Sequence, residues 1–232
     1  MVKVSVVTVV FNDGAGLRRT LDSVLEQERV VLEPIVIDGG SVDSTREVMQ
    51  RYSSGLAKWV SEPDEGIFHA MDKGLSLATG DWVIFMNAGD CFASKSVLSQ
   101  LELDSAGEYA IVYGSKEQGG RRIDPLPVGP ATYAGVIFAC HQSMLFNRRR
   151  LGSALHYHQA CQIYGDFELV ARLFKEGFRF LKKDLIVARF EGGGISARVS
   201  WQKRLEKYRI LWMYFGWTGT ILGFWNRLVR RW

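Results

Sequence analysis

An acidic side chain follows a buried apolar run in this chain, at a position where ligand chemistry is easily built. Residues 61–66 form an acidic turn, 67–78 have a helical pattern, and the apolar run 82–86 leads to Asp90. In an open sheet of parallel strands, ligands bind outside the carboxyl ends of the strands. A nucleoside diphosphate held through a divalent cation needs an oxygen ligand there. We therefore expect chemistry at this segment, with Asp90 as a candidate metal ligand.

Two further strand ends place polar residues at the same expected edge. The first strand, 4–10, runs into Asn12, and the second, 31–37, ends at Asp38. A carboxylate at Asp38 is suited to accept a hydrogen bond from the imide or ring nitrogen of a base. Taken singly, Asp38 has the character of a turn residue, and Asp90 that of a cap for a following helix. Their occurrence together at one edge favours a binding site.

The elements that must position these residues alternate over the first ninety positions. The run 4–10 is β-branched and nearly continuous, which is typical of a parallel strand covered on both faces. Ile67, Met71, Leu75 and Ala78 share one stripe of a helix. The alternation predicts an α/β fold with a doubly wound, mostly parallel sheet flanked by helices.

Beyond residue 90 the alternation loosens, although Pro34 already suggests irregular pairing in the second strand. We expect a catalytic domain over 1–198, with a nucleotide-binding half at 1–90 and an acceptor half at 91–198. Its second half is expected to contain helices near 94–101 and 167–175, strands near 110–113 and 143–146, and a mobile loop over 114–130.

The C-terminal segment, 199–232, is basic and aromatic. Residues 210–226 carry no charge and include three tryptophans, but they are few and rich in glycine for a membrane span. Tryptophan beside arginine fits an interfacial element. We expect an amphipathic, aromatic helical tail that associates with a membrane surface. The alternative is a helix pair that packs on the catalytic domain.

The bulk composition excludes several classes of protein. The chain has 232 residues, a formal net charge of +4 and 47% hydrophobic residues, so it is globular rather than disordered. It has no P-loop, no dinucleotide fingerprint, and no Gly-rich phosphate loop of the nucleotidyltransferase type after the first strand. Its basic residues cluster beside tryptophans, so nucleic acid is not an expected partner.

The start of the chain and its cysteines indicate the cellular compartment in which the chain is expected to reside. No basic stretch followed by an apolar run opens the chain, and Cys91, Cys140 and Cys161 have no zinc or disulfide spacing. We expect a reduced, cytosolic chain in which these cysteines are small buried hydrophobic residues.

Four motifs then occur in order, at Thr8–Asn12, Val36–Thr45, Ser61–Gly66 and Phe85–Asp90. Together they resemble the family 2 inverting glycosyltransferases, which have the GT-A fold, and in particular bacterial enzymes of surface-polysaccharide assembly such as lipopolysaccharide or capsule. The resemblance implies a nucleoside-diphosphate sugar as donor. It implies donor contacts at Thr8, Val10, Asn12, Asp38, Gly39, Asp64, Asn87 and Ala88.

One position departs from the family pattern. Where the family has Asp-x-Asp, which binds the divalent cation, this chain has Asn87-Ala88-Gly89, and only the adjoining Asp90 is acidic. The resemblance implies Mg²⁺ or Mn²⁺ held by Asp90, with water and the diphosphate supplying other ligands. A metal-independent enzyme is the alternative.

The acceptor side is expected in the second half of the chain. An inverting transfer needs a base for the acceptor hydroxyl, and the motif around Asp166 resembles the family's base at the start of a late helix. Glu168 is a rival base. His141 and Gln142 resemble the segment that leads to the acceptor, and the glycines at 192–194 resemble a loop that closes over the diphosphate.

The function expected from these residues is inverting transfer of one sugar to a saccharide or lipid-linked saccharide. The enzyme would act in the cytoplasm, peripheral to the inner face of the plasma membrane. The alternative is a non-catalytic carbohydrate- or membrane-binding protein on a degenerate glycosyltransferase fold.

Overall fold

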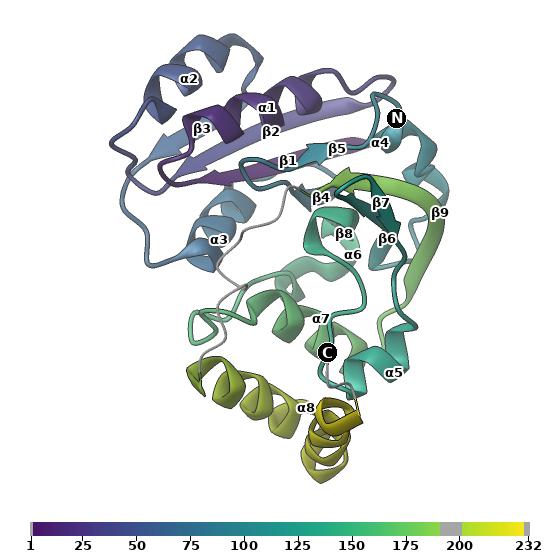
Figure 1. The fold of residues 1–232 in the computed structure, drawn as a ribbon. Coiled ribbons are helices and arrows are strands. Elements are labelled where there is room, and N and C mark those ends of the chain that lie inside the picture. The colour runs from purple at the N-terminus through teal and green to yellow at the C-terminus, as the bar shows by residue number, and fades with distance from the viewer. Residues whose placement is uncertain (1, 191–200, 230–232) are drawn as a thin grey trace.

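The computed structural model describes residues 2–190 and 201–229 and shows a curled sheet with helices on both faces (Figure 1). The first half alternates as expected. Its elements are β1 (Lys3–Val10), α1 (Gly14–Leu25), β2 (Val31–Asp38), α2 (Thr45–Tyr52), β3 (Lys58–Ser61), α3 (Ile67–Leu77) and β4 (Trp82–Phe85).

The second half is more mixed. It contains β5 (Cys91–Phe92), α4 (Val97–Gln100), β6 (Ile111–Gln118), β7 (Arg121–Ile123), α5 (Val128–Tyr133), β8 (Met144–Asn147), α6 (Arg148–Leu151), α7 (Gly165–Lys175), β9 (Phe180–Arg189) and α8 (Trp201–Val229).

The sheet has the order β3-β2-β1-β4-β8-β6-β9-β5, with β7 paired to β6. The strands β3, β2, β1 and β4 are parallel to one another, whereas β8 runs antiparallel to both β4 and β6. The predicted parallel α/β arrangement is therefore confirmed for the first half. The later strands add four antiparallel pairs, β4 with β8, β5 with β9, β6 with β7 and β6 with β8.

The helices cover the two faces of the parallel strands as their apolar stripes require. Helices α1 and α2 lie on one face and α3 on the other (Figure 1). In α3, Gly74 allows a close approach to the sheet, because a Cβ there would lie 2.3 Å from Cγ1 of Val7. The amino end of α1 is capped by Asp13, whose side chain accepts a hydrogen bond from the N–H of Gly16.

Two expectations about local structure were wrong. Pro34 does not disturb pairing. The strand β3 begins opposite Ile35, one residue after the proline, so no residue of β3 lies where the N–H that proline lacks would point. The expected mobile loop at 114–130 is largely ordered: β6 continues to Gln118, and Gly119 and Gly120, both with positive φ, turn it into β7.

The cysteine expectation holds only in part. Cys161 is buried, whereas Cys91 and Cys140 are half-buried. Burial raises the pKa of the Cys140 thiol to about 11, which disfavours its thiolate at neutral pH.

The C-terminal helix packs on the catalytic body, as in the alternative considered above. Ile210 and Leu211 are buried against Phe167 and Ala171 of α7. The helix is kinked at Gly216, so the two halves form a V below α5 and α7 (Figure 1). None of the helices described is long and apolar enough to cross a bilayer. The expected boundary at 198/199 and the glycines at 192–194 lie outside the described residues.

Candidate active site

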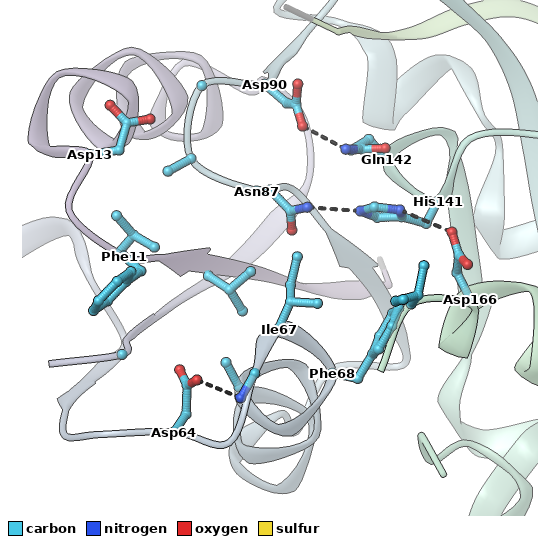
Figure 2. Close-up of a pocket in the computed structure, with 18 of the residues that line it drawn as sticks. Phe11, Asp13, Asp64, Ile67, Phe68, Asn87, Asp90, His141, Gln142 and Asp166 are labelled. Carbon is cyan, nitrogen blue, oxygen red and sulfur yellow. Dashed lines mark hydrogen bonds and ion pairs between the residues drawn. The ribbon is translucent and has the colours of Figure 1, made fainter. Parts of the chain in front are cut away.

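A cavity of about 820 Å³ opens at the carboxyl ends of β1, β2 and β4, and α7 forms its opposite wall (Figure 2). The segments that follow the three strands therefore meet at one edge, as the topology predicted. The cavity is lined by Val9, Val10, Phe11, Asp13, Gly39, Asp64, Gly66, Ile67, Phe68, Ala70, Asn87, Ala88, Gly89, Asp90, His141, Gln142, Gln162, Ile163, Asp166 and Phe190.

The end of β1 contributes an exposed aromatic ring and a tight turn. The Phe11 side chain is 65% exposed. Asn12 adopts a left-handed conformation with φ of 51°, which asparagine tolerates better than most residues. Its N–H donates to Oγ of Ser41 at 2.7 Å, and its Oδ1 accepts from the N–H of Val42 at 2.9 Å. Asn12 thus joins the first two strand ends and does not itself line the cavity.

Asp38 is buried beneath the second strand end. Its carboxylate accepts hydrogen bonds from the N–H and Oγ of Ser41 and from Oγ of Ser61, the last at 2.6 Å. These contacts fold the turn that presents Gly39 to the cavity. Neither Asp38 nor Thr8, which is buried within β1, is among the lining residues. Their direct contact with a ligand stays a prediction.

Asp64 lies in the acidic turn before α3 and faces the cavity. Its Oδ1 accepts a hydrogen bond from the N–H of Gly66 at 2.9 Å. Its Oδ2 lies close to Gly39, where an added Cβ would be only 2.7 Å away. The absence of a side chain at Gly39 is therefore what lets the second strand end and the acidic turn meet.

The turn after β4 carries Asn87, Ala88 and Asp90 into the cavity. It is closed by a hydrogen bond from the N–H of Asp90 to the carbonyl oxygen of Asn87 and is held by Oγ1 of Thr20. The Asp90 carboxylate is buried and accepts a hydrogen bond from Nε2 of Gln142 at 2.6 Å. Oδ1 of Asn87 is buried and has no hydrogen-bond partner among the described residues.

The opposite wall begins at the first turn of α7, where Asp166 points into the cavity (Figure 2). Its side chain is 26% exposed, and its Oδ2 lies 3.7 Å from Nδ1 of His141. The helix starts close to α3, because Gly165 allows contact with the ring of Phe68. His141 and Gln142 are neighbours in one turn and Asp166 belongs to the later helix α7, and the structure brings all three to this wall.

Glu168, the rival base, does not face the cavity. It is buried between α7 and α8, where Arg172 donates to its Oε1 at 3.0 Å and the Tyr214 hydroxyl also donates to it. Burial raises the pKa of Tyr214, and this hydrogen bond raises it further. Glu168 therefore joins two helices and is unavailable to an acceptor in the cavity.

The cavity wall is acidic. Asp13, Asp64, Asp90 and Asp166 line it, and no Lys or Arg among the described residues does so. Within residues 2–190 and 201–229, no group of three His, Cys, Asp or Glu side chains converges on a metal position. A cation bound in this cavity would therefore need further oxygen ligands from the bound substrate.

Sequence reasoning did not single out several lining residues as ligand contacts. Phe11 had a usable signal, because a large exposed aromatic directly after a buried strand is unusual. Asp13 has the pattern of a helix cap and serves as one. Ile67 and Phe68 belong to the apolar stripe of α3, and Gln162, Ile163 and Phe190 lie in connections with no motif.

The chain was compared with known proteins. Residues 5–170 match the model of the family described as glycosyl transferase family 2. An uncharacterized glycosyltransferase of Mycobacterium tuberculosis is 34% identical over 177 residues, which cover 73% of this chain and 68% of that protein. The amylovoran biosynthesis glycosyltransferase AmsB of Erwinia amylovora is 26% identical over 231 residues, with coverage of 90% and 76%. A PGL/p-HBAD biosynthesis glycosyltransferase of M. tuberculosis is 26% identical over 203 residues, with coverage of 83% and 78%.

Solved structures show a similar fold. S. aureus TarS 1–349 in complex with UDP-GlcNAc gives a TM-score of 0.75 at 15% identity, covering 91% of this chain and 66% of that chain. The mannosyltransferase PcManGT of Pyrobaculum calidifontis, in complex with GDP-Man and Mn²⁺, gives 0.67 at 19% identity, with coverage of 91% and 62%. At such identities the likeness shows the fold, which is that of GT-A glycosyltransferases. With the family model and the sequence relatives, it follows that this chain is a glycosyltransferase and belongs to glycosyl transferase family 2.

Proposed function

We propose that this chain transfers one sugar from a nucleoside-diphosphate sugar to a saccharide or lipid-linked saccharide with inversion at the anomeric carbon. The observation that carries the proposal is the single cavity in which three strand ends face Asp166 on α7. A donor on the strand-end side and an acceptor on the α7 side would meet within it. No feature of the cavity favours the non-catalytic alternative.

The donor side is assigned to the ends of β1, β2 and β4. The exposed ring of Phe11 offers a surface on which a base can stack. Val10, Gly39, Asp64, Asn87 and Ala88 line the same side. The complexes of TarS with UDP-GlcNAc and of PcManGT with GDP-Man support a donor of this class. Asn12 and Asp38 would act by shaping the two turns.

The charge of the cavity supports a divalent cation as the partner of the diphosphate. A diphosphate placed among four carboxylates, with no Lys or Arg on the described wall, would be repelled unless positive charge accompanied it. Asp90 supplies one carboxylate, and the unpartnered Oδ1 of Asn87 lies in the same turn. Hard oxygen donors with few protein ligands fit Mg²⁺ or Mn²⁺. When bound, the cation would neutralise the diphosphate.

Asp166 is assigned as the base. In the step proposed, the acceptor oxygen bonds to the anomeric carbon from the side opposite the diphosphate. The bond from that carbon to the diphosphate oxygen breaks as its electron pair leaves with the nucleoside diphosphate. The acceptor's proton passes to the Asp166 carboxylate. We propose that Gln142, Gln162 and Ile163, which line the cavity, contact the acceptor.

Donor turnover tests this assignment. The purified chain is incubated with a panel of UDP- and GDP-sugars and saccharide or lipid-linked acceptors, and release of nucleoside diphosphate is measured. We expect Asp166→Asn to lower kcat by about 100-fold or more. Glu176→Gln, on the exposed end of the same helix, is the matched control. No release with any donor and acceptor would overturn the enzymatic proposal.

The cation is tested in the same assay. EDTA is expected to lower release at least about tenfold, and added Mg²⁺ or Mn²⁺ to restore it, because the diphosphate then meets the acidic wall without its partner. Asp90→Ala should raise the metal concentration needed for half-maximal activity. Activity that is indifferent to EDTA would contradict this part of the proposal and favour a metal-independent enzyme.

We further propose that α8 holds the enzyme on the anionic cytoplasmic face of the membrane, near a lipid-linked acceptor for surface-polysaccharide assembly. Its outward side is apolar and aromatic: Trp217 is 72% exposed, and Trp212, Met213, Ile221, Leu222, Phe224 and Trp225 are exposed as well. The sequence around them is basic, with Arg209 and Arg227 at the two ends of the uncharged run. Aromatic rings with flanking cations fit an anionic lipid surface.

Vesicle sedimentation tests this docking. The full chain is expected to sediment with vesicles of phosphatidylglycerol and to remain in solution with vesicles of phosphatidylcholine. A variant with Trp217→Ser and Trp225→Ser should lose most sedimentation, whereas Trp59→Ser, which removes an exposed tryptophan on β3, should not. Equal sedimentation of all variants, or self-association through α8 in place of lipid binding, would overturn it.

A further inference from the structure

His141 connects the two walls of the cavity. It lies in the short turn His141–Ser143, between β4 and α7 in space, and its side chain is 15% exposed. Nε2 of its ring lies 3.0 Å from Nδ2 of Asn87, and Nδ1 lies 3.7 Å from Oδ2 of Asp166. Figure 2 shows the three side chains in a row, from the strand-end side to α7.

The contact with Asn87 determines where the imidazole carries its proton. An amide nitrogen has hydrogens and no acceptor lone pair, so Nδ2 of Asn87 can only donate. Nε2 of His141 is therefore the acceptor and carries no hydrogen. In a neutral imidazole the proton then resides on Nδ1, which is the nitrogen that faces the Asp166 carboxylate.

The turn around His141 holds the ring in place. The N–H and Oγ of Ser143 both donate to the carbonyl oxygen of Cys140, which closes the turn. The next side chain, Gln142, is fixed by its hydrogen bond to Asp90 and accepts one from the Cys140 thiol. These contacts fix the turn from which the ring projects, and the ring itself lies between Asn87 and Asp166.

We propose that His141 is a positioning residue that holds the carboxylate of Asp166 through its Nδ1–H, and that Asn87 sets the tautomer that makes this possible. The inference rests on the proposed role of Asp166 as the base. At 3.7 Å the contact is longer than a hydrogen bond. Contacts of this kind between catalytic groups commonly shorten in the reacting complex. Fixing one carboxylate oxygen leaves the other lone pairs aimed at the acceptor hydroxyl, which raises turnover through orientation.

The proposal also accounts for the amide at position 87, where the family resemblance implies an acid. A carboxylate there could only accept a hydrogen bond. It would draw the imidazole proton onto Nε2 and leave the lone pair of Nδ1 against the Asp166 carboxylate. In this chain the amide of Asn87 keeps the imidazole proton on Nδ1, whereas an acid at the same position would draw it onto Nε2.

The tautomer is tested without any activity measurement. Long-range ¹H–¹⁵N correlation spectra of the uniformly ¹⁵N-labelled chain distinguish the two neutral tautomers, and His141→Asn identifies which of the four histidines gives the signal. We expect the Nδ1–H tautomer in the wild type and a shift toward the Nε2–H tautomer in Asn87→Ala. An Nε2–H tautomer of His141 in the wild type would overturn the proposal.

Kinetics test the positioning role, with variants that separate the two ring nitrogens. The amide nitrogen of Asn can occupy the place of Nδ1, whereas that of Gln reaches the place of Nε2. We expect His141→Ala and His141→Gln to lower kcat by about 10- to 100-fold, with donor KM changed by less than about threefold. His141→Asn should recover most of kcat.

Different kinetic results would overturn the role of His141 and the role of Asp166. If His141→Asn is no better than His141→Ala, or if donor KM rises while kcat is unchanged, His141 does not position the base. If Asp166→Asn, measured in parallel, retains full kcat, the assignment of the base fails instead. Loss of activity in Asp166→Asn together with wild-type kcat in every His141 variant would remove only the present inference.

Discussion

At the scale of residues, hydrogen bonds within turns shape the strand-end side of the cavity. Asp38 directs its carboxylate to Ser41 and Ser61, and Asn12 directs its amide to Val42. These bonds give the backbone its shape, and the backbone then presents Gly39 beside Asp64. The polar residues that mark this motif in the sequence therefore act largely on their own loop.

Gly39→Ala tests how closely this loop must approach the acidic turn. The added Cβ would lie 2.7 Å from Oδ2 of Asp64 and 3.3 Å from Cδ2 of Phe11, so the carboxylate must move. We expect donor KM to rise about tenfold, since a displacement of this size disturbs ligand positioning. Gly107→Ala, where the new methyl group meets open space, is the control. An unchanged donor KM with unchanged stability would contradict the prediction.

Single residues also show where sequence reasoning reaches its limit. The placement of Asp90 and Asp166 on the cavity followed from strand ends and from a family motif. That Asp38 faces inward depends on Ser61, which reaches it from another strand. The pairing of Asn87 with His141 joins residues 54 positions apart. Such contacts depend on the packed fold, so the spacing of these residues along the sequence could not reveal them.

At the scale of elements, α8 braces the helix that carries Asp166, the proposed base. Oε1 of Glu206 accepts hydrogen bonds from the N–H groups of Ile163 and Tyr164, at 3.0 and 2.7 Å, directly before α7. Tyr214 adds a second tie to Glu168 one turn further on. The segment expected to associate with a membrane surface is thus also hydrogen-bonded to Ile163 on the cavity wall.

Glu206→Ala should weaken this brace. Two backbone N–H groups lose their acceptor, which typically costs about 1–3 kcal/mol of the free energy of unfolding when they stay buried. Because Ile163 and Tyr164 lead into α7, we also expect kcat to fall about three- to tenfold. Urea denaturation and turnover measure the two effects. Glu206→Gln keeps an acceptor oxygen and should lie between the wild type and Glu206→Ala; equal loss in both variants would implicate charge and not the hydrogen bonds.

Elements were predicted best where they alternate regularly. The continuous apolar runs of β1 and β2 fit strands covered on both faces, and the regular stripe of α3 fits a helix packed on the sheet. The region 114–130 was expected to be a mobile loop because it is rich in glycine, proline and arginine. Gly119 and Gly120 instead supply the positive φ values of a hairpin turn. The same residue type marks a loop or a tight turn, and strand pairing decides which.

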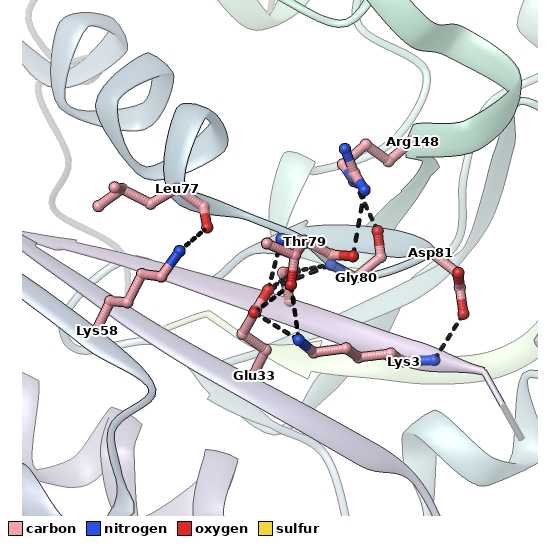
Figure 3. A network of polar contacts seen from close by, with 9 residues as sticks. Lys3, Glu33, Lys58, Leu77, Thr79, Gly80, Asp81 and Arg148 are labelled. Atoms are coloured by element: carbon pink, nitrogen blue, oxygen red, sulfur yellow. Dashed lines mark hydrogen bonds and ion pairs between the residues drawn. The ribbon is translucent and has the colours of Figure 1, made fainter.

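At the scale of the whole molecule, the candidate site and a buried polar network lie at opposite ends of the parallel strands. The cavity lies at the carboxyl ends of the strands, and a buried carboxylate, Glu33, joins elements near their amino ends (Figure 3). Its oxygens accept hydrogen bonds from Lys3 at 2.6 Å, from Ser5 at 2.6 Å and from Thr79 at 2.6 and 2.7 Å. One side chain therefore connects β1, β2 and the segment that enters β4.

This network predicts an acid-sensitive contribution to stability. Burial alone would raise the pKa of Glu33, but the hydrogen bonds from Lys3, Ser5 and Thr79 outweigh it and lower the pKa from 4.5 to about 2. A depressed pKa in the folded state stabilises the fold above the unfolded value, and this contribution, about 3 kcal/mol, is lost as pH falls from about 4.5 to about 2. In urea denaturation, Glu33→Gln should therefore lower the free energy of unfolding at pH 7 and converge with the wild type toward pH 2–3. Glu47→Gln, which removes an exposed carboxylate on α2, is the control. A constant difference between Glu33→Gln and the wild type across this range would contradict the assignment, because the loss would then come from shape and not from charge.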